Sequence, residues 1–87
     1  PLRFLCATFC NQRNVEKAIS YCEEALRQDS GFIATRVTFA RFLVELQNSQ
    51  RALEVCEPVL TLPRTQNPEG IDACAEMTRV LRLGGGQ

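Results

Sequence analysis

One segment of this chain is repeated 34 residues further along. When the sequence is shifted by 34 positions, identical residues meet at Asn14 and Asn48, Ala18 and Ala52, Cys22 and Cys56, Glu23 and Glu57, and Leu26 and Leu60. A fixed period of about 20 to 50 residues is typical of chains built from stacked supersecondary units, each of which buries its apolar face against its neighbours. The repetition therefore predicts a tandem array and constrains the fold more than any other feature.

Upstream of this segment a small residue recurs at the same interval, at Cys6, Ala40 and Cys74. The pattern resembles the tetratricopeptide repeat family, whose 34-residue unit is a helix, a turn and a second helix. The residues that carry the resemblance are Leu2, Leu5, Cys6, Phe9, Ala18, Cys22 and Ala25 in the first unit, and Arg36, Phe39, Ala40, Leu43, Ala52, Cys56 and Val59 in the second. The units are degenerate, because no Trp or Gly stands at the family positions.

The resemblance implies an all-α fold of right-handed helical hairpins, a tetratricopeptide-like fragment of an α-solenoid with about five helices. We expect one domain over residues 1–83, with repeat one at about 1–32, repeat two at about 33–66, a further or capping helix at about 67–83, and a flexible tail at 84–87. The chain enters its apolar pattern at Leu2 without an initiating Met, so we expect a piece of a longer protein.

Helix start and stop signals support this organisation. Asn14 and Asn48 precede apolar stripes with a spacing of three and four residues, which predicts capped helices over Val15–Gln28 and from Asn48 or Ser49 to about Thr61. Pro58 falls inside the second of these helices and should kink it or unwind its last turn.

Two further helices are predicted. The segment Phe32–Leu46 is apolar almost all round, which favours an inner helix between neighbours. Asn67 and Pro68 begin a helix from about Glu69 to Leu83, after which Gly84 is expected to take a left-handed terminating conformation.

Charge and composition exclude several classes of function. Ten basic residues are balanced by ten acidic ones, so no overall field attracts nucleic acid or an anionic membrane. No apolar run approaches the roughly 18 residues of a membrane helix, and residues 1–10 do not resemble a signal peptide. The five cysteines are odd in number and are not spaced like a secreted disulfide framework, which favours a reducing, cytoplasmic location.

The cysteines are the residues that most invite a chemical interpretation. Cys6 and Cys10 lie one helical turn apart and could supply two thiolate ligands, but the chain has no His and no second close pair. We therefore expect no metal site and no cofactor, and we interpret cysteines at repeat positions as compact apolar residues. Without His, a nucleophile would lack its usual base, and Gly84–Gly86 ends the chain instead of opening a phosphate-binding helix, so an enzyme is not expected.

The resemblance implies a concave surface formed by the first helix of each hairpin, which would hold a peptide, a helix or a partner subunit. Arg41 lies near its middle, where a guanidinium can pair with a carboxylate. The residues expected to contact this protein partner are Arg3, Ala34, Val37, Arg41, Val44, Glu45, Ile71 and Arg79. Two alternatives remain open, which are single-stranded RNA binding in the manner of pentatricopeptide repeats and a purely structural segment of a longer solenoid.

Overall fold

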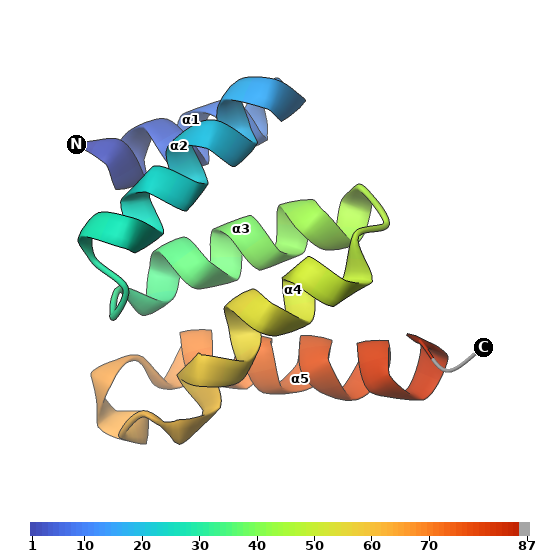
Figure 1. The fold of residues 1–87 in the computed structure, drawn as a ribbon. Helices are drawn as coiled ribbons and strands as arrows, with labels where there is room; N and C mark the ends of the chain where they lie inside the picture. The colour runs from blue at the N-terminus through green and yellow to red at the C-terminus, as the bar shows by residue number, and fades with distance from the viewer. Residues whose placement is uncertain (86–87) are drawn as a thin grey trace.

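The computed structural model describes residues 1–85 and shows an all-helical chain, with no strand within that range. Figure 1 shows five α-helices in succession. They are α1 (Leu2–Asn11), α2 (Val15–Gln28), α3 (Ile33–Glu45), α4 (Ser49–Cys56) and α5 (Pro68–Gly85), with 3-10 segments η1 (Glu57–Thr61) and η2 (Arg64–Gln66) between the last two. The predicted all-α class with about five helices is confirmed.

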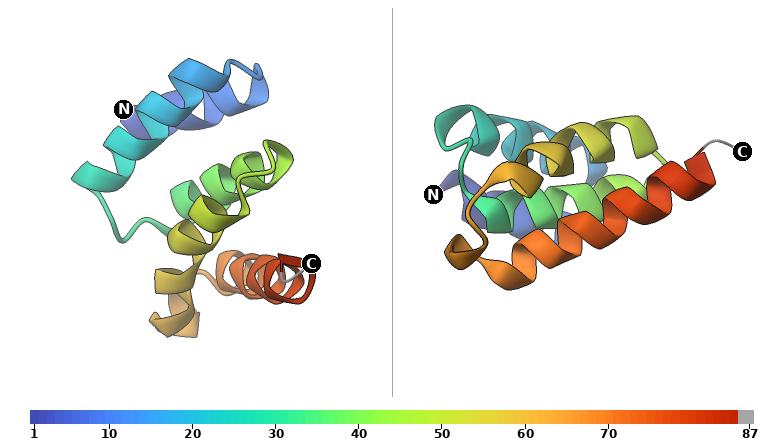
Figure 2. Two further views of the ribbon diagram at one scale, coloured as in Figure 1. Left: turned by 45° about the vertical axis from the view of Figure 1, so that its right-hand side comes forward. Right: turned by 90° about the horizontal axis from the view of Figure 1, so that it is seen from below.

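The helices form two layers. Helix α3 packs against α1 on one side and α5 on the other, while α2 and α4 lie on the opposite layer, as the right-hand view of Figure 2 shows. The shortest dimension of the molecule is 18 Å, which is about two helices thick. One broad side of the slab is therefore made by α1, α3 and α5.

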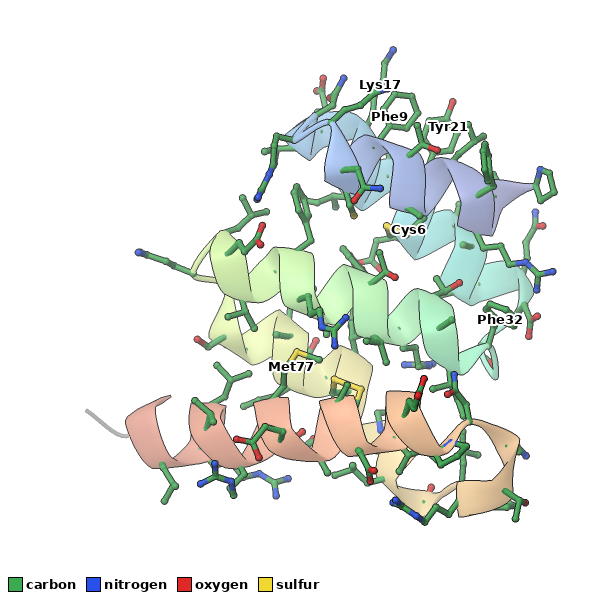
Figure 3. All side chains as sticks on the ribbon, turned by 180° about the vertical axis from the view of Figure 1, so that it is seen from behind. Cys6, Phe9, Lys17, Tyr21, Phe32 and Met77 are labelled. Carbon is green, nitrogen blue, oxygen red and sulfur yellow. A yellow bond between two sulfur atoms is a disulfide. The ribbon has the colours of Figure 1, made fainter. Side chains whose placement is uncertain are left out.

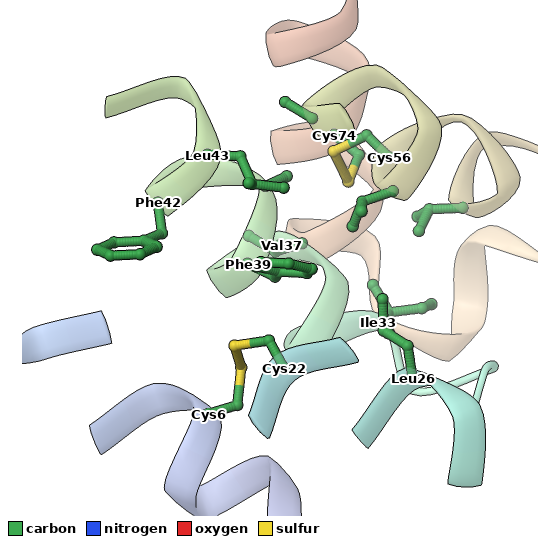
Figure 4. Close-up of a cluster of buried hydrophobic side chains, with 14 of the residues drawn as sticks. Cys6, Cys22, Leu26, Ile33, Val37, Phe39, Phe42, Leu43, Cys56 and Cys74 are labelled. Atoms are coloured by element: carbon green, nitrogen blue, oxygen red, sulfur yellow. A yellow bond between two sulfur atoms is a disulfide. The ribbon is translucent and has the colours of Figure 1, made fainter. Parts of the chain in front are cut away.

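Helix α3 supplies the centre of the core. Phe39 and Leu43 are fully buried, and Figure 4 shows them beside the sulfur atoms of neighbouring helices. Buried positions occur around most of the circumference of α3, as the sequence predicted for an inner helix. At the start of α3, Gly70 of α5 approaches Ile33 so closely that a Cβ added at Gly70 would lie 2.7 Å from Cγ2 of Ile33.

The turns inside the two hairpins have the same backbone conformation. Arg13 has φ 60° and Gln47 has φ 64°, and these left-handed residues are 34 positions apart. Each precedes an Asn whose side chain accepts a hydrogen bond from a backbone N–H of the following helix, Asn14 from Lys17 and Asn48 from Arg51. The sequence repeat thus extends to backbone geometry, because the same helix end and helix start are built twice.

Polar side chains join the first hairpin to the second. Arg51 of α4 donates two hydrogen bonds to the Glu23 carboxylate of α2, from Nε at 2.9 Å and from Nη2 at 2.5 Å. Arg36 donates to the backbone carbonyls of Ser30 at 2.8 Å and Val55 at 3.0 Å, and burial lowers the pKa of its guanidinium. These contacts fix α4 relative to α2 and to the connection between the hairpins.

The end of α4 agrees with the prediction, and the end of α5 differs from it. Helix α4 changes to a 3-10 conformation at Glu57, one residue before Pro58, so the predicted unwinding is confirmed. Helix α5 continues to Gly85, and no described glycine has a positive φ, so the expected left-handed stop at Gly84 is wrong. Gly86 and Gln87 of the expected flexible tail lie outside the described residues.

Candidate functional site

The broad side made by α1, α3 and α5 carries three shallow hollows, and we call it the odd-helix face. Figure 3 views the molecule from this side, with the three helices in front. Two hollows lie between α1 and α3, and the third lies between α3 and α5. Thr38, near the middle of α3, lines all three, so they form one interrupted groove.

The first hollow is apolar and lies at the start of α1 and α3. Phe4 lines it with 68% of its surface exposed, opposite Phe32 and Ala34. Arg3 covers the Phe32 ring, with its guanidinium carbon 4.1 Å from the ring centroid. The exposed ring of Phe4 therefore gives an apolar side chain of a partner a surface to pack against.

The second hollow lies at the other end of α1 and α3, and it is polar. Arg13 and Glu45 form an ion pair across it, joining the turn after α1 to the last turn of α3. Arg41 and the thiol-bearing Cys10 also line this hollow. It therefore combines one neutralised ion pair with one additional positive charge.

The third hollow separates α3 from the start of α5. Its lining includes Val37 and Arg41 of α3 and Glu69 of α5. Arg41 consequently stands on the ridge between the second and third hollows, within reach of a ligand in either.

Arg41 differs from most cations of the chain in having no acidic partner among residues 1–85. Six arginines pair with carboxylates: Arg13, Arg27, Arg51, Arg64, Arg79 and Arg82. Hydrogen bonds from Arg27, Arg64 and Arg79 hold the pKa values of Glu24, Asp72 and Glu76 below their usual range. These acids are committed to arginine partners, whereas the Arg41 guanidinium is available to an external anion.

The structure distributes the eight predicted contact residues unevenly. Arg3, Ala34, Arg41 and Glu45 line the hollows and are exposed. Val37 reaches the third hollow with only 7% of its surface exposed, and Ile71 is equally buried in the core and lines none of the three. Val44 packs against the core, and Arg79 pairs with Glu76 away from the hollows.

Sequence reasoning missed three residues of this surface, Phe4, Phe32 and Thr38. Phe4 could have been found, because it is a large apolar residue on α1 that falls outside the buried positions Cys6 and Cys10. Phe32 was assigned to the inner helix itself, whereas the structure places it at the N-cap with its ring towards α1.

Four of the five cysteines are paired, which corrects their interpretation as separate compact apolar residues. Cys6 and Cys22 form a disulfide within the first hairpin, and Cys56 and Cys74 form one between α4 and α5. The sequence argument for a reducing location rested on unpaired cysteines and therefore no longer holds. Cys10 is free and buried, and burial together with the nearby Glu45 carboxylate raises the pKa of its thiol.

Both outer sides of the helix stack also expose apolar side chains. On α5, Val80 and Leu83 are 50% and 67% exposed. On the first hairpin the Phe9 and Tyr21 rings are stacked with their centroids 5.3 Å apart, and Figure 3 labels them. No helix among the described residues has the length and apolar character needed to cross a bilayer.

Comparison with models of protein families, with curated proteins and with solved structures gave no match. The geometry of the odd-helix face is therefore the basis for a functional proposal.

Proposed function

We propose that this chain is a tetratricopeptide-like interaction module that holds a segment of a partner protein along the odd-helix face. The observation that carries the proposal is the position of Arg41, an unpaired guanidinium between two hollows near the middle of α3. A peptide or helix that places a carboxylate on Arg41 would form charge-assisted hydrogen bonds, which are stronger than neutral ones.

The size of the hollows supports a macromolecular ligand over a small metabolite. The first, second and third hollows measure about 250, 280 and 280 Å³, whereas drug-sized ligands occupy cavities of about 300 to 1,000 Å³ that enclose most of their surface. Shallow hollows in a row suit successive side chains of one extended or helical segment.

The chemistry of the hollows suggests the order of groups in that segment. An aromatic or aliphatic side chain would cover Phe4 and Phe32 at one end of the face, and a carboxylate would meet Arg41 further along. The identical turns at Arg13 and Gln47 support the tetratricopeptide-like part of the proposal, since they extend the 34-residue repeat to the backbone.

RNA binding is less well supported by the distribution of charge. Arrays that bind single-stranded RNA need cations free to meet phosphates, but most arginines here are already paired with carboxylates of the same chain. On the odd-helix face, the hollows are lined by two arginines without a carboxylate partner in residues 1–85, Arg3 and Arg41, which would give a weak electrostatic attraction.

Selection from a library of random displayed peptides, with the oxidised chain as target, tests the proposal. We expect the selected peptides to share an acidic residue near an aromatic or aliphatic one. Arg41→Ala should weaken their binding by about tenfold or more, the size expected for losing a hydrogen bond to a charged group. Isothermal calorimetry measures the change.

Arg27→Ala is the matched control, because Arg27 is an exposed arginine on α2 in the other layer. Its binding should equal that of the unchanged chain. Selected peptides without acidic residues, or binding that survives Arg41→Ala, would refute the proposal. Tight binding of polyuridylate that weakens steeply with salt would favour the RNA alternative instead.

A further inference from the structure

Three cysteine sulfurs meet inside the first hairpin. Cys6 and Cys10 lie one turn apart on α1, and Cys22 faces them from α2. Their Sγ atoms all lie within 4.8 Å of one another, and those of Cys10 and Cys22 are 3.7 Å apart. All three residues are buried, and Figure 4 shows the Cys6–Cys22 pair at the edge of the core.

The shape of this cluster does not suit exchange of the disulfide with Cys10. Thiolate attack requires the incoming and leaving sulfurs to lie on opposite sides of the attacked sulfur, nearly in line. An in-line arrangement through Cys22 would separate Cys10 and Cys6 by more than the 4.8 Å that bounds the cluster, so the three atoms form a triangle.

A triangle of sulfurs is instead suited to holding one soft metal ion at its centre. We propose that Cys6, Cys10 and Cys22, once a low-molecular-weight thiol has reduced the Cys6–Cys22 disulfide, bind one Cu(I) ion through three thiolates. In the first step two thiol molecules are oxidised to one disulfide, and their two protons pass to the two protein sulfurs. In the second step three Cu–S bonds form, three protons leave to solvent, and copper stays Cu(I).

The ligand set favours Cu(I) over Zn(II). Soft thiolates select both ions, but Zn(II) in proteins is almost always four-coordinate, and with three protein ligands it takes a water molecule as the fourth, which this buried cluster would have to admit. The chain contains no His, and among residues 1–85 no Asp or Glu oxygen joins the three sulfurs within the same 4.8 Å. Cu(I) accepts three sulfur ligands in a plane, so it does not require a fourth.

The surroundings allow entry of the ion and offset part of the charge of the complex. Cys10 lines the second hollow of the odd-helix face, which opens to solvent. Three thiolates and one Cu(I) carry two net negative charges; in the same hollow Arg13 is paired with Glu45, and Arg41 supplies one further positive charge. The α-carbons of Cys6 and Cys22 are 4.6 Å apart, so the packing of α1 on α2 keeps the sulfurs close after reduction.

The chain contains its own control. Cys56 and Cys74 form the other disulfide, and among the described residues no third cysteine joins them in such a cluster. Reduction of that bridge yields two thiols and not three. The proposal therefore predicts one strong copper site in the first hairpin and none of equal strength between α4 and α5.

The test uses the whole 87-residue chain, reduced with a phosphine under anaerobic conditions and titrated with Cu(I) against a competing chromophoric Cu(I) chelator. The unchanged chain should bind one equivalent, and Cys56→Ser/Cys74→Ser should bind it equally well. Cys10→Ser should bind at least about 100-fold more weakly, because losing a residue that merely orients a ligand already costs about 10- to 100-fold. Circular dichroism of each reduced variant, with and without Cu(I), monitors the fold.

X-ray absorption at the copper edge tests the number of sulfur ligands without a substitution in the chain. The reduced, unchanged chain loaded with one equivalent of Cu(I) should show three sulfur neighbours. Two sulfur neighbours, undiminished affinity in Cys10→Ser, or loss of the site in Cys56→Ser/Cys74→Ser would each overturn the proposal.

Discussion

The two disulfides should contribute a large part of the stability of so small a domain, and removing either one tests this directly. The bridged cysteines are 16 residues apart in the first hairpin and 18 apart between α4 and α5. Closing a loop of about this length in the unfolded chain stabilises the folded state by about 3 kcal/mol. This stabilising free energy varies only with the logarithm of loop length, so the two disulfides should stabilise the fold by almost equal amounts.

Cys6→Ala/Cys22→Ala and Cys56→Ala/Cys74→Ala are the corresponding perturbations. For a domain of this size each kcal/mol moves the thermal midpoint by about 4 to 8 °C, so each pair variant should melt about 12 to 24 °C below the oxidised chain. Loss of both bridges would remove about 6 kcal/mol from a total that is typically about 5 to 15 kcal/mol. We therefore expect the fully reduced chain to remain folded with a much smaller free energy of unfolding than the oxidised chain.

Thermal unfolding followed by circular dichroism, with and without a phosphine reductant, provides the measurement. Cys10→Ala is the control, because Cys10 is the free cysteine and both bridges remain in that variant. Its midpoint should respond to reductant as that of the unchanged chain does. Non-reducing tryptic digestion should join peptide 4–13 to 18–27 and peptide 52–64 to 65–79.

Equal midpoints for the oxidised and reduced chain would refute the reasoning, as would tryptic peptides joined in any other combination. A large effect of one pair and none of the other would contradict the loop-length argument in particular.

Further predictions concern single side chains. Thr78→Val should raise the free energy of unfolding by about 1 kcal/mol in urea unfolding, because Thr78 is only 2% exposed and its hydroxyl has no hydrogen-bond partner among the described residues. Thr61→Val is the control: it removes a hydroxyl that donates to a backbone carbonyl, so it should not raise the free energy of unfolding. Gln47→Gly should raise the free energy of unfolding by about 0.5 to 1 kcal/mol, since the φ of 64° at Gln47 is strained for a residue with a side chain. A lower free energy of unfolding in the same urea experiment would contradict the assigned turn. The hydrogen bond from Arg64 lowers the pKa of Asp72 in the folded state. The Arg64–Asp72 pair therefore stabilises the fold fully at pH values above the pKa of Asp72 in the unfolded chain, and this contribution is lost as the pH falls through the pKa of Asp72 in the folded chain. Asp72→Asn should therefore flatten the pH dependence of the melting temperature on the acid side, and an unchanged slope would argue against that pair.

Most of the secondary structure could be predicted because its signals are local. Val15–Gln28 was predicted with both boundaries correct, since Asn14 caps the helix and its apolar stripe is regular. The unwinding near Pro58 follows from one missing N–H. At Gly84 the local rule failed, because a glycine at a helix end permits the left-handed conformation without requiring it.

The candidate site was harder to predict because it depends on how the helices pack. The family resemblance implied that Arg41 faces the groove, and the structure shows it exposed on α3, beside two hollows. Ile71 was expected on the same surface. However, Gly70 allows α5 to approach α3 closely, and the neighbouring Ile71 is buried in the core. The cysteine pairs depend on distances between helices, and neither their odd number nor their spacing along the chain reveals which sulfurs meet.

The order of the two bridges along the chain has a consequence for biosynthesis. The first ring closes with Cys22 and the second opens only at Cys56, so the rings follow one another without nesting or crossing. Each can form as soon as its own two thiols have left the ribosome, and neither requires threading through the other. Oxidation before Cys56 has emerged can join only Cys6, Cys10 and Cys22, so any wrong pairing is confined to the first hairpin and does not entangle the second ring.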